Sequence, residues 1–257
     1  MRARPTGRSS NVRASGRRKT VLKIAATADV HAGGVEDLER LQNLAQNAAR
    51  EADVLAIGGD LTNHGHLEEL EVLLKALDDC PIPVVTTLGN HDHESGNAHE
   101  LSLLLAESRI HLLDRSSIVI DGVGFSGVKG FCGGFDQTMA NSFGEDLFKA
   151  WVTEGILEAE ALKNELRGLE TKRRVAVLHY APIRATIESE PPEIHAFLGT
   201  SRLGSALDEG GATVAFHGHA HKGPFEGKTP GGVPVYNVSV PVLEHERFEH
   251  SYRIVEV

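Results

Sequence analysis

The sequence predicts an α/β fold in which most strands run parallel, and three observations support this expectation. Short apolar runs alternate along the chain with segments whose apolar residues recur at helical spacing. In the first half this alternation occurs three times in succession, which implies parallel strands with helices packed on the sheet faces. Five of the apolar runs also end in a residue type that can bind a metal ion. These residues are Asp29, Asp60, Asn90, His179 and His219.

The elements of the first half follow from these runs. The predicted strands are residues 21–28, 53–57 and 83–88. Two helices are predicted between them, each with its apolar residues on one face. These residues are Leu38, Leu41, Ala45 and Ala48 in the first helix and Leu67, Leu70, Leu74 and Leu77 in the second. Because each helix returns the chain to the same edge of the sheet, the three strands are expected to run parallel.

The second half predicts further strands and one long helix. The strands are residues 117–120, 123–128, 175–178, 212–216, 233–238 and 252–257, and the helix is residues 145–167. No change of composition, linker or internal repeat interrupts residues 21–257. We therefore expect this range to form a single domain, a size that is ordinary for an α/β fold.

The first twenty residues differ from the rest in charge. Residues 1–20 contain seven Arg and Lys residues and no acid, although the whole chain has a net charge of −10. The remaining residues therefore carry −17. Because residues 1–20 also lack apolar periodicity, we expect a disordered basic tail. The pair Arg17 and Arg18 is similar to a twin-arginine export signal, but the apolar stretch behind it is short and is interpreted as the first strand.

The composition of the rest of the chain bears on partners and location. The net negative charge of residues 21–257 argues against a nucleic-acid polymer as partner, because such a surface has no overall positive potential to attract a long polyanion. A small phosphate substrate stays compatible, since bound cations reverse the charge locally. No window approaches the ~18 consecutive apolar residues of a membrane helix. The two cysteines, Cys80 and Cys132, are too few for a disulfide framework, so a reducing cytoplasm is expected. The oligomeric state is not predicted.

The polar residues at the strand ends are weak evidence for a metal site when each is taken separately. Asp29 and His31 could belong to a turn with a capping aspartate, and a histidine such as His179 is usually structural. A stronger indication is a set of three alternating histidines. They are His217, His219 and His221. Since open α/β sheets bind ligands at the carboxyl ends of their strands, all these residues are expected to converge on one site.

Together and in this order, the five blocks resemble the calcineurin-like metallophosphoesterase superfamily. The blocks are Asp-x-His at 29–31, Gly-Asp at 59–60, Gly-Asn-His-Asp at 89–92, the histidine at 179 and Gly-His-x-His at 218–221. The resemblance covers about residues 21–242. It implies a four-layer α/β/β/α sandwich, in which two central sheets are flanked by helices and a dimetal centre lies at the strand ends.

The resemblance also implies which residues hold the two metal ions. Those matching the ligands of the first ion are Asp29, His31 and His221. Those matching the ligands of the second ion are Asn90, His179 and His219, and Asp60 matches the bridging carboxylate. A mixed nitrogen and oxygen donor set without thiolate suits Mn, Fe, Co or Zn, among which the sequence does not choose.

For such a centre the resemblance implies hydrolysis of a phosphoester by a hydroxide that bridges the metal ions. Two ions about 3.5–4 Å apart acidify a shared water and offset the charge that builds on the phosphoryl oxygens. His91 is not a ligand in the family pattern. Because it directly follows Asn90, its imidazole is expected to face the substrate and to stabilise charge or protonate the leaving oxygen. His91 is therefore the predicted catalytic residue.

Two further residues are predicted to support this site. In the protein Ser/Thr phosphatases of the superfamily, an aspartate three residues after the bridging aspartate pairs with the catalytic histidine. Here that position is Asn63, whose amide can orient an imidazole but cannot stabilise imidazolium by charge. This departure weakens the case for protein phosphatase activity. Asp92 is either a partner for a ligand histidine or a residue that caps its own loop.

Two other cationic residues lie near the motifs. Lys129 belongs to the glycine-rich segment 127–134, which could bring backbone amides to a phosphate but is interpreted as a turn between strands. Arg184 follows His179 by five residues and could equally contact a phosphate or lie on the surface.

The predicted function is metal-dependent hydrolysis of a small phosphodiester or phosphomonoester. The Gly-Asp-Leu-Thr and Gly-Asn-His-Asp segments look somewhat more like those of bacterial cyclic-nucleotide phosphodiesterases than like those of protein phosphatases. One alternative is a non-catalytic scaffold, but such members tend to lose ligands or the catalytic histidine, and here all are present. Another is a nuclease, which would need a basic groove that the acidic body does not supply.

Overall fold

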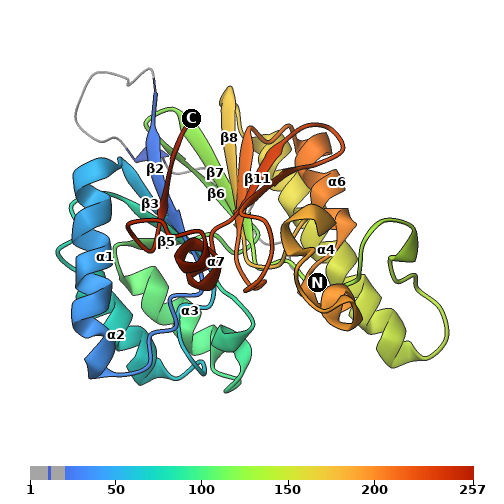
Figure 1. Cartoon of the computed structure of the whole chain (residues 1–257), viewed down its shortest axis with the longest axis horizontal. Helices are drawn as coiled ribbons and strands as arrows, with labels where there is room; N and C mark the ends of the chain where they lie inside the picture. Colours follow the sequence, from blue (N-terminus) through green and yellow to red (C-terminus); the bar gives the residue numbers. More distant parts are fainter. Residues whose placement is uncertain (1–10, 13–20) are drawn as a thin grey trace, which may run out of the picture.

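The computed structural model describes residues 11–12 and 21–257, and these residues form four layers. Two β-sheets face each other in the centre, and helices cover the outer face of each sheet (Figure 1). The predicted α/β/β/α sandwich is therefore confirmed. None of the helices in the described part of the chain combines the length and the apolar character that a membrane crossing requires.

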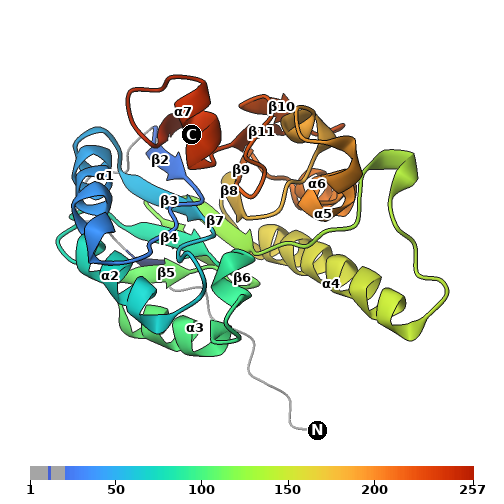
Figure 2. The same ribbon diagram turned by 60° about the horizontal axis from the view of Figure 1, so that its bottom comes forward.

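The first sheet has five strands in the order β12-β2-β3-β4-β5. Their bounds are Lys23–Thr27 for β2, Val54–Gly58 for β3, Val84–Thr87 for β4, Ile110–Leu112 for β5 and Arg253–Glu256 for β12. Strands β2 to β5 are parallel, and β12 runs antiparallel to β2. The outer face is covered by α1 (Leu38–Glu51), α2 (Leu67–Leu77) and α3 (Ala98–Glu107) (Figure 2).

The second sheet has seven strands in the order β1-β6-β7-β8-β9-β11-β10. Their bounds are Asn11–Val12, Ser116–Ile120, Val123–Val128, Arg173–Leu178, Val214–His217, Pro234–Asn237 and Glu226–Lys228 in that order. Strands β7, β8, β9 and β11 are parallel, whereas β6 and β10 pair antiparallel with their neighbours β7 and β11. The outer face is covered by α4 (Asp146–Gly168) and α6 (Ser201–Gly210).

Short helices occupy the connections. The α-helical ones are α5 (His195–Leu198) and α7 (Val240–His245). The 3₁₀ turns are η1 (Val35–Asp37), η2 (His91–His93), η3 (Asp136–Thr138), η4 (Arg184–Ile187) and η5 (Pro192–Ile194). Several of these turns lie at the edge of the sheets where the predicted site residues gather.

Three apolar clusters hold the four layers together. Between the sheets, side chains such as Ile24, Phe125 and Phe216 are buried. A second cluster lies between the first sheet and α1 to α3, and a third lies between the second sheet and helices α4 and α6. Because each central strand is covered on both faces, its sequence is continuously apolar, and all five residues of β3 are buried. This packing places the carboxyl ends of the parallel strands of both sheets at a common edge.

The three strands and two helices predicted for the first half are present, and the chain adds one helix and one strand that were not expected. Helix α3 and strand β5 follow β4 and extend the first sheet. Leu101 and Leu105 of α3 are buried at helical spacing, so the pattern was available in the sequence. The predicted basic tail lies outside the described residues apart from Asn11 and Val12, which pair with Val119 and Ile120 of β6.

Candidate metal centre

The predicted ligands come together at the carboxyl-terminal edge of the two sheets. Three of the loops follow strands β2, β3 and β4 of the first sheet, and two follow β8 and β9 of the second. Three groups form, and within each group the potential ligand atoms lie within 4.8 Å of one another; one of them joins His91 to His31 and Asp60. The first group is Asp29, His31 and His221, and the second is Asp60, His179 and His219.

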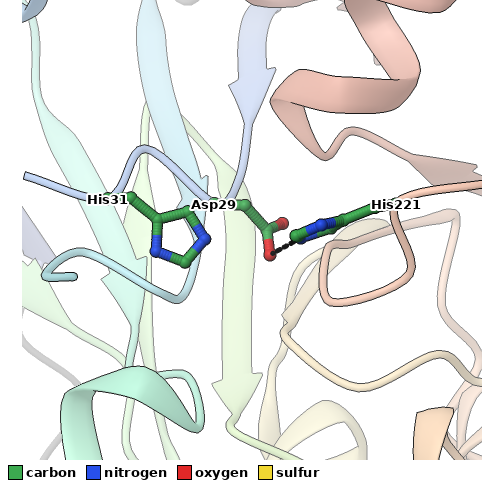
Figure 3. Close-up of side chains that lie close together, drawn as sticks. All are labelled: Asp29, His31 and His221. Carbon is green, nitrogen blue, oxygen red and sulfur yellow. Dashed lines mark hydrogen bonds and ion pairs between the residues drawn. The ribbon is translucent and has the colours of Figure 1, made fainter. Parts of the chain in front are cut away.

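The first group is held around the carboxylate of Asp29, which lies between the rings of His31 and His221 (Figure 3). Asp29 Oδ1 is 3.3 Å from His221 Nε2. Both carboxylate oxygens also accept from the backbone N–H of His219, at 3.1 and 3.0 Å. The buried Nδ1 of His31 has no hydrogen-bond partner. A carboxylate is therefore fixed in place beside two imidazoles, one of which retains an unused ring nitrogen.

The second group surrounds His179. Its Nε2 lies 2.8 Å from Asn90 Oδ1 and 3.3 Å from Asp60 Oδ1. The other oxygen of Asp60, Oδ2, is 3.9 Å from His31 Nε2 in the first group. The Asp60 carboxylate thus reaches both groups, which is the position that a bridging ligand requires.

Backbone carbonyls orient two of the imidazoles. His179 Nδ1 lies 2.9 Å from the carbonyl of Gly58, and His219 Nε2 lies 3.2 Å from the carbonyl of Phe197. A carbonyl can only accept, so each of these nitrogens carries the proton. The opposite nitrogen of each ring then keeps its lone pair, which is the form that binds a metal ion.

The backbone at this edge adopts conformations that non-glycine residues rarely take. The φ angles of the predicted ligands are 57° for Asp29, 42° for His31, 49° for Asp60 and 66° for His219. Left-handed φ values cost free energy in such residues and persist where the surroundings enforce them. Their concentration at one sheet edge indicates a functional site.

Two glycines allow the carboxylates to approach the backbone. A Cβ added at Gly89 would collide with the carboxylate of Asp60, and a Cβ added at Gly218 would collide with that of Asp29. The glycine that precedes Asn90 in the sequence motif, and the one that precedes His219, are therefore needed for close packing of the site.

The electrostatics of the site favour bound cations. Burial raises the pKa of Asp60 to about 9, with further contributions from the negative charges of Asp29 and Asp92. Burial also keeps the ring of His219 neutral by lowering its pKa to about 3, and it lowers the pKa of His179 well below its usual value. Clustered carboxylates beside neutral imidazoles destabilise the folded protein when no cation is bound. The same arrangement of donors favours the binding of cations. The nitrogen and oxygen donors present fit two ions such as Mn, Fe, Co or Zn.

His91 lies beside the first and second groups and forms the remaining one with His31 and Asp60. Its Nδ1 donates to the backbone carbonyl of Asn63 at 2.7 Å, and its Nε2 is 4.0 Å from Asp60 Oδ2. The ring meets that of His31 edge to face, with centroids 4.7 Å apart. The carboxylate of Glu94 is 3.5 Å from His91 Nδ1. The imidazole is thus held with Nε2 directed towards the carboxylate that both groups share.

The two predicted supporting residues, Asn63 and Asp92, make different kinds of contact with the site. The side-chain amide of Asn63 lies 3.1 Å from His64 Nε2, so its backbone carbonyl and not its side chain orients His91. Asp92 is buried and accepts from the backbone N–H groups of Leu61, Thr62 and Gly89 and from the Thr62 hydroxyl. These contacts correspond to the loop-capping interpretation of Asp92, because they tie the loop after β3 to the loop after β4.

Several residues that contact the site were not identified from the sequence. The ring of Tyr180 packs on those of His219 and His179, with centroid distances of 4.4 and 5.5 Å. Tyr180 directly follows His179, so adjacency was the available signal. The carbonyl of Phe197 and the carboxylate of Glu94 gave no signal, because neither belongs to a motif.

The comparisons with known proteins agree with this geometry. The family model for calcineurin-like phosphoesterases matches residues 22–223. The chain therefore belongs to the calcineurin-like phosphoesterase family. Membership supports a metal-dependent phosphoester hydrolase in general. No match was found among curated protein sequences.

Solved structures share the fold at low sequence identity. A phosphopantetheinyl hydrolase from Mycobacterium tuberculosis superposes with a TM-score of 0.66 at 19% identity, covering 91% of this chain and 95% of that one. TT1561 of Thermus thermophilus gives 0.55 at 17% identity, covering 86% and 90%. GAP50, described as the anchor in the inner membrane complex of Plasmodium, gives 0.51 at 11% identity, covering 87% and 73%. These similarities establish the fold.

Proposed function

We propose that residues 21–257 form one domain that hydrolyses a small phosphodiester or phosphomonoester with two bound metal ions. The first ion is assigned to Asp29, His31 and His221, and the second to Asn90, His179 and His219, with Asp60 shared between them. The observation that carries this proposal is the position of Asp60. Its two carboxylate oxygens face His179 and His31, which belong to different groups.

Two metal ions bound by these residues would supply an acidified water and positive charge for the phosphoryl oxygens. The protein contributes the remaining parts of the chemistry. His91 is assigned as the group that touches the substrate, where the ring protonated on both nitrogens can stabilise charge or hand the Nε2 proton to the leaving oxygen. Asn63 and Asp92 act on His91 and its loop through the hydrogen bonds described above.

The substrate is expected to be small, because the acidic body offers no extended field for a long polyanion. We expect the reaction to take place in the cytoplasm, since the only two cysteines of the chain, Cys80 and Cys132, are both unpaired and buried.

The experiment that tests this function begins with metal-stripped protein. It is reloaded separately with Mn, Fe, Co and Zn and assayed on paired chromogenic phosphomonoesters and phosphodiesters. Turnover that depends on metal supports the proposal, and the ratio of the two rates separates a phosphatase from a phosphodiesterase. Stoichiometric metal binding without turnover of either ester, for every metal, would overturn it.

A non-catalytic scaffold is the second candidate, because GAP50 has the same fold and is described as an anchor. The retention of His91 beside all seven predicted ligands argues against this role for the present chain. The variant His91→Asn discriminates between the two. A catalytic role predicts lost turnover with metal retained, whereas a scaffold should keep its partner binding and show no turnover to lose.

A further inference from the structure

A series of aromatic rings connects the metal centre with the protruding end of helix α4. We call these rings the aromatic strip. Its members, from the centre outwards, are Tyr180, Phe131, Trp151, Phe148 and Phe143. Successive centroids are 5.9, 6.0, 5.7 and 5.2 Å apart. The chain has only thirteen Phe, Trp and Tyr residues, so five of them in one series is a marked concentration.

The inner end of the strip touches the predicted ligands. The Tyr180 ring lies 4.4 Å from that of His219 and 5.5 Å from that of His179, measured between centroids. Tyr180 itself is only 7% exposed, so a group that extends outwards from a phosphate at the metal centre would contact the strip from the half-buried ring of Phe131 outwards.

The outer end of the strip is exposed to solvent. Phe143 is 66% exposed, and Leu147, one helical turn before Trp151, is 85% exposed. The loop before α4 and the first turns of that helix project beyond the rest of the molecule (Figure 2). Ile194 and Phe197 add further exposed apolar side chains on the segment whose carbonyl contacts His219. Exposed apolar side chains gathered on neighbouring segments are typical of a binding surface.

A positive charge lies at the inner end of the strip. The ammonium group of Lys129 is 4.8 Å from the centroid of the Phe131 ring and 5.2 Å from that of Tyr180. Lys129 also lines a cavity of about 590 Å³ together with Leu88 and His93, which flank the loop of Asn90 and His91. Asp114, Glu154 and Glu158 line the same cavity, so carboxylates offset the charge of Lys129 there.

We propose that the aromatic strip binds the organic group of the phosphoester, and that the substrates are esters of an elongated apolar alcohol. The inference rests on the proposed function. The metal centre would bind the phosphate, the strip binds the apolar group, and the acidic remainder of the surface disfavours a substrate with further phosphates. A nucleobase could cover one or two of the rings, whereas the strip continues over five and ends on exposed Phe143 and Leu147.

The test uses Trp151, the only tryptophan of the chain, as a fluorescent reporter inside the strip. Butyl-, hexyl- and octylphosphonate are titrated into the full chain loaded with Mn, below their micelle-forming concentrations. Complete burial of a methylene tightens binding about fourfold, and half-burial about twofold. We therefore expect octylphosphonate to bind roughly tenfold more tightly than butylphosphonate, with a change in Trp151 emission. Because phosphonates are not hydrolysed, this readout is independent of turnover.

Matched variants locate the effect. The variant Phe131→Ala, at the ring next to Tyr180 and within reach of an octyl chain, should reduce the ratio of octyl to butyl affinity by at least about threefold. The control is Val35→Ser with Leu103→Ser, which removes exposed apolar side chains of η1 and α3 and should leave the ratio unchanged.

Metal-free protein should bind every phosphonate more weakly but with the same dependence on chain length. Equal affinity for all chain lengths, or a dependence unaltered in the strip variant, would overturn the inference. The inference would also be overturned if the wild-type protein self-associates and loses the dependence of affinity on alkyl chain length when it is diluted. In that case a second copy of the chain would cover the strip. If the protein hydrolyses no ester but its affinity for phosphonates still increases with chain length, the proposed function is contradicted. The binding role of the strip is then still supported.

Discussion

The ring of His91 is oriented by the backbone of Asn63, whose carbonyl oxygen accepts from His91 Nδ1 at 2.7 Å. Because the carbonyl fixes the proton on Nδ1, the Nε2 atom is the one available to a substrate. The side chain of Asn63 points instead to His64. Asn63, which replaces the aspartate of the protein phosphatase pattern, therefore acts through its backbone carbonyl oxygen, an atom that every residue has.

This relationship predicts different outcomes for two neighbouring substitutions. His91→Asn should lower kcat by about 10²–10⁴ while the bound metal remains stoichiometric, since it removes the proton-transfer group and no ligand. Asn63→Ala keeps the carbonyl and should change kcat by less than about threefold. The measurement is steady-state kinetics with metal content determined on the same samples. A loss in Asn63→Ala equal to that in His91→Asn would show that the Asn63 side chain takes part.

Asp92 is predicted to stabilise the fold of the site. Its carboxylate accepts four hydrogen bonds while fully buried, and two of its donors, Leu61 N–H and Gly89 N–H, meet the same oxygen. In Asp92→Asn an amide NH₂ would face donors at one of the two oxygen positions. We expect the free energy of unfolding to fall by about 3 kcal/mol. Urea unfolding checks this, with exposed Asp79→Asn as a control expected within about 0.5 kcal/mol of wild type.

A methyl group at Gly218 is predicted to damage the metal centre. The added Cβ would overlap the carboxylate of Asp29, so either that side chain or the backbone of the loop must move. Gly218→Ala should lose about 2 kcal/mol of stability and bind metal more weakly, as calorimetry would show. Gly168→Ala is the control, because no atom lies within 4 Å of a Cβ at this helical position. It should be neutral or stabilising by up to about 1 kcal/mol. Similar losses in both variants would contradict the close-packing argument.

Asp60→Asn is predicted to stabilise the metal-free protein. Burial and the neighbouring carboxylates raise the pKa of Asp60 to about 9. Between its unfolded value of about 4 and that folded value, folding takes up a proton, so stability falls as the pH rises through this window. Asparagine carries no charge, and its oxygen can still accept from the backbone N–H of His91, as Asp60 does at 2.9 Å. We expect a gain of about 2–4 kcal/mol at pH 7, larger at pH 8 than at pH 5.

The measurement is chemical unfolding of chelator-treated protein across that pH range. In parallel, the variant should bind metal more weakly than wild type, because the shared carboxylate is replaced by a neutral amide. Equal free energies of unfolding for the two proteins at pH 8 would show that the buried carboxylates do not destabilise the metal-free protein.

The sequence predicted most of the first sheet because its strands are buried on both faces. Such strands are continuous apolar runs, and the structure places β2 and β4 within the ranges expected and β3 one residue beyond the end of its range. The second half was less regular in pattern. Short edge elements such as β10, whose three residues are largely exposed, have no apolar run to identify them.

The site was predictable to the extent that its side chains are distinctive. Aspartate, asparagine and histidine at strand ends are recognisable by residue type, and parallel strands bring their ends to one edge. The sequence alone thus determined the α/β class, the set of residues that gather there and the choice of His91 as the residue beside them.

Only the tertiary structure decided how these residues are held. The carbonyls of Gly58, Asn63 and Phe197 orient His179, His91 and His219, and a carbonyl leaves no trace in residue identity because every residue has one. The aromatic strip likewise joins residues from the loop after β8, from α4 and from the loop between β7 and α4. Contacts between segments so distant along the chain depend on the packing of the sheets and helices, and not on any local pattern.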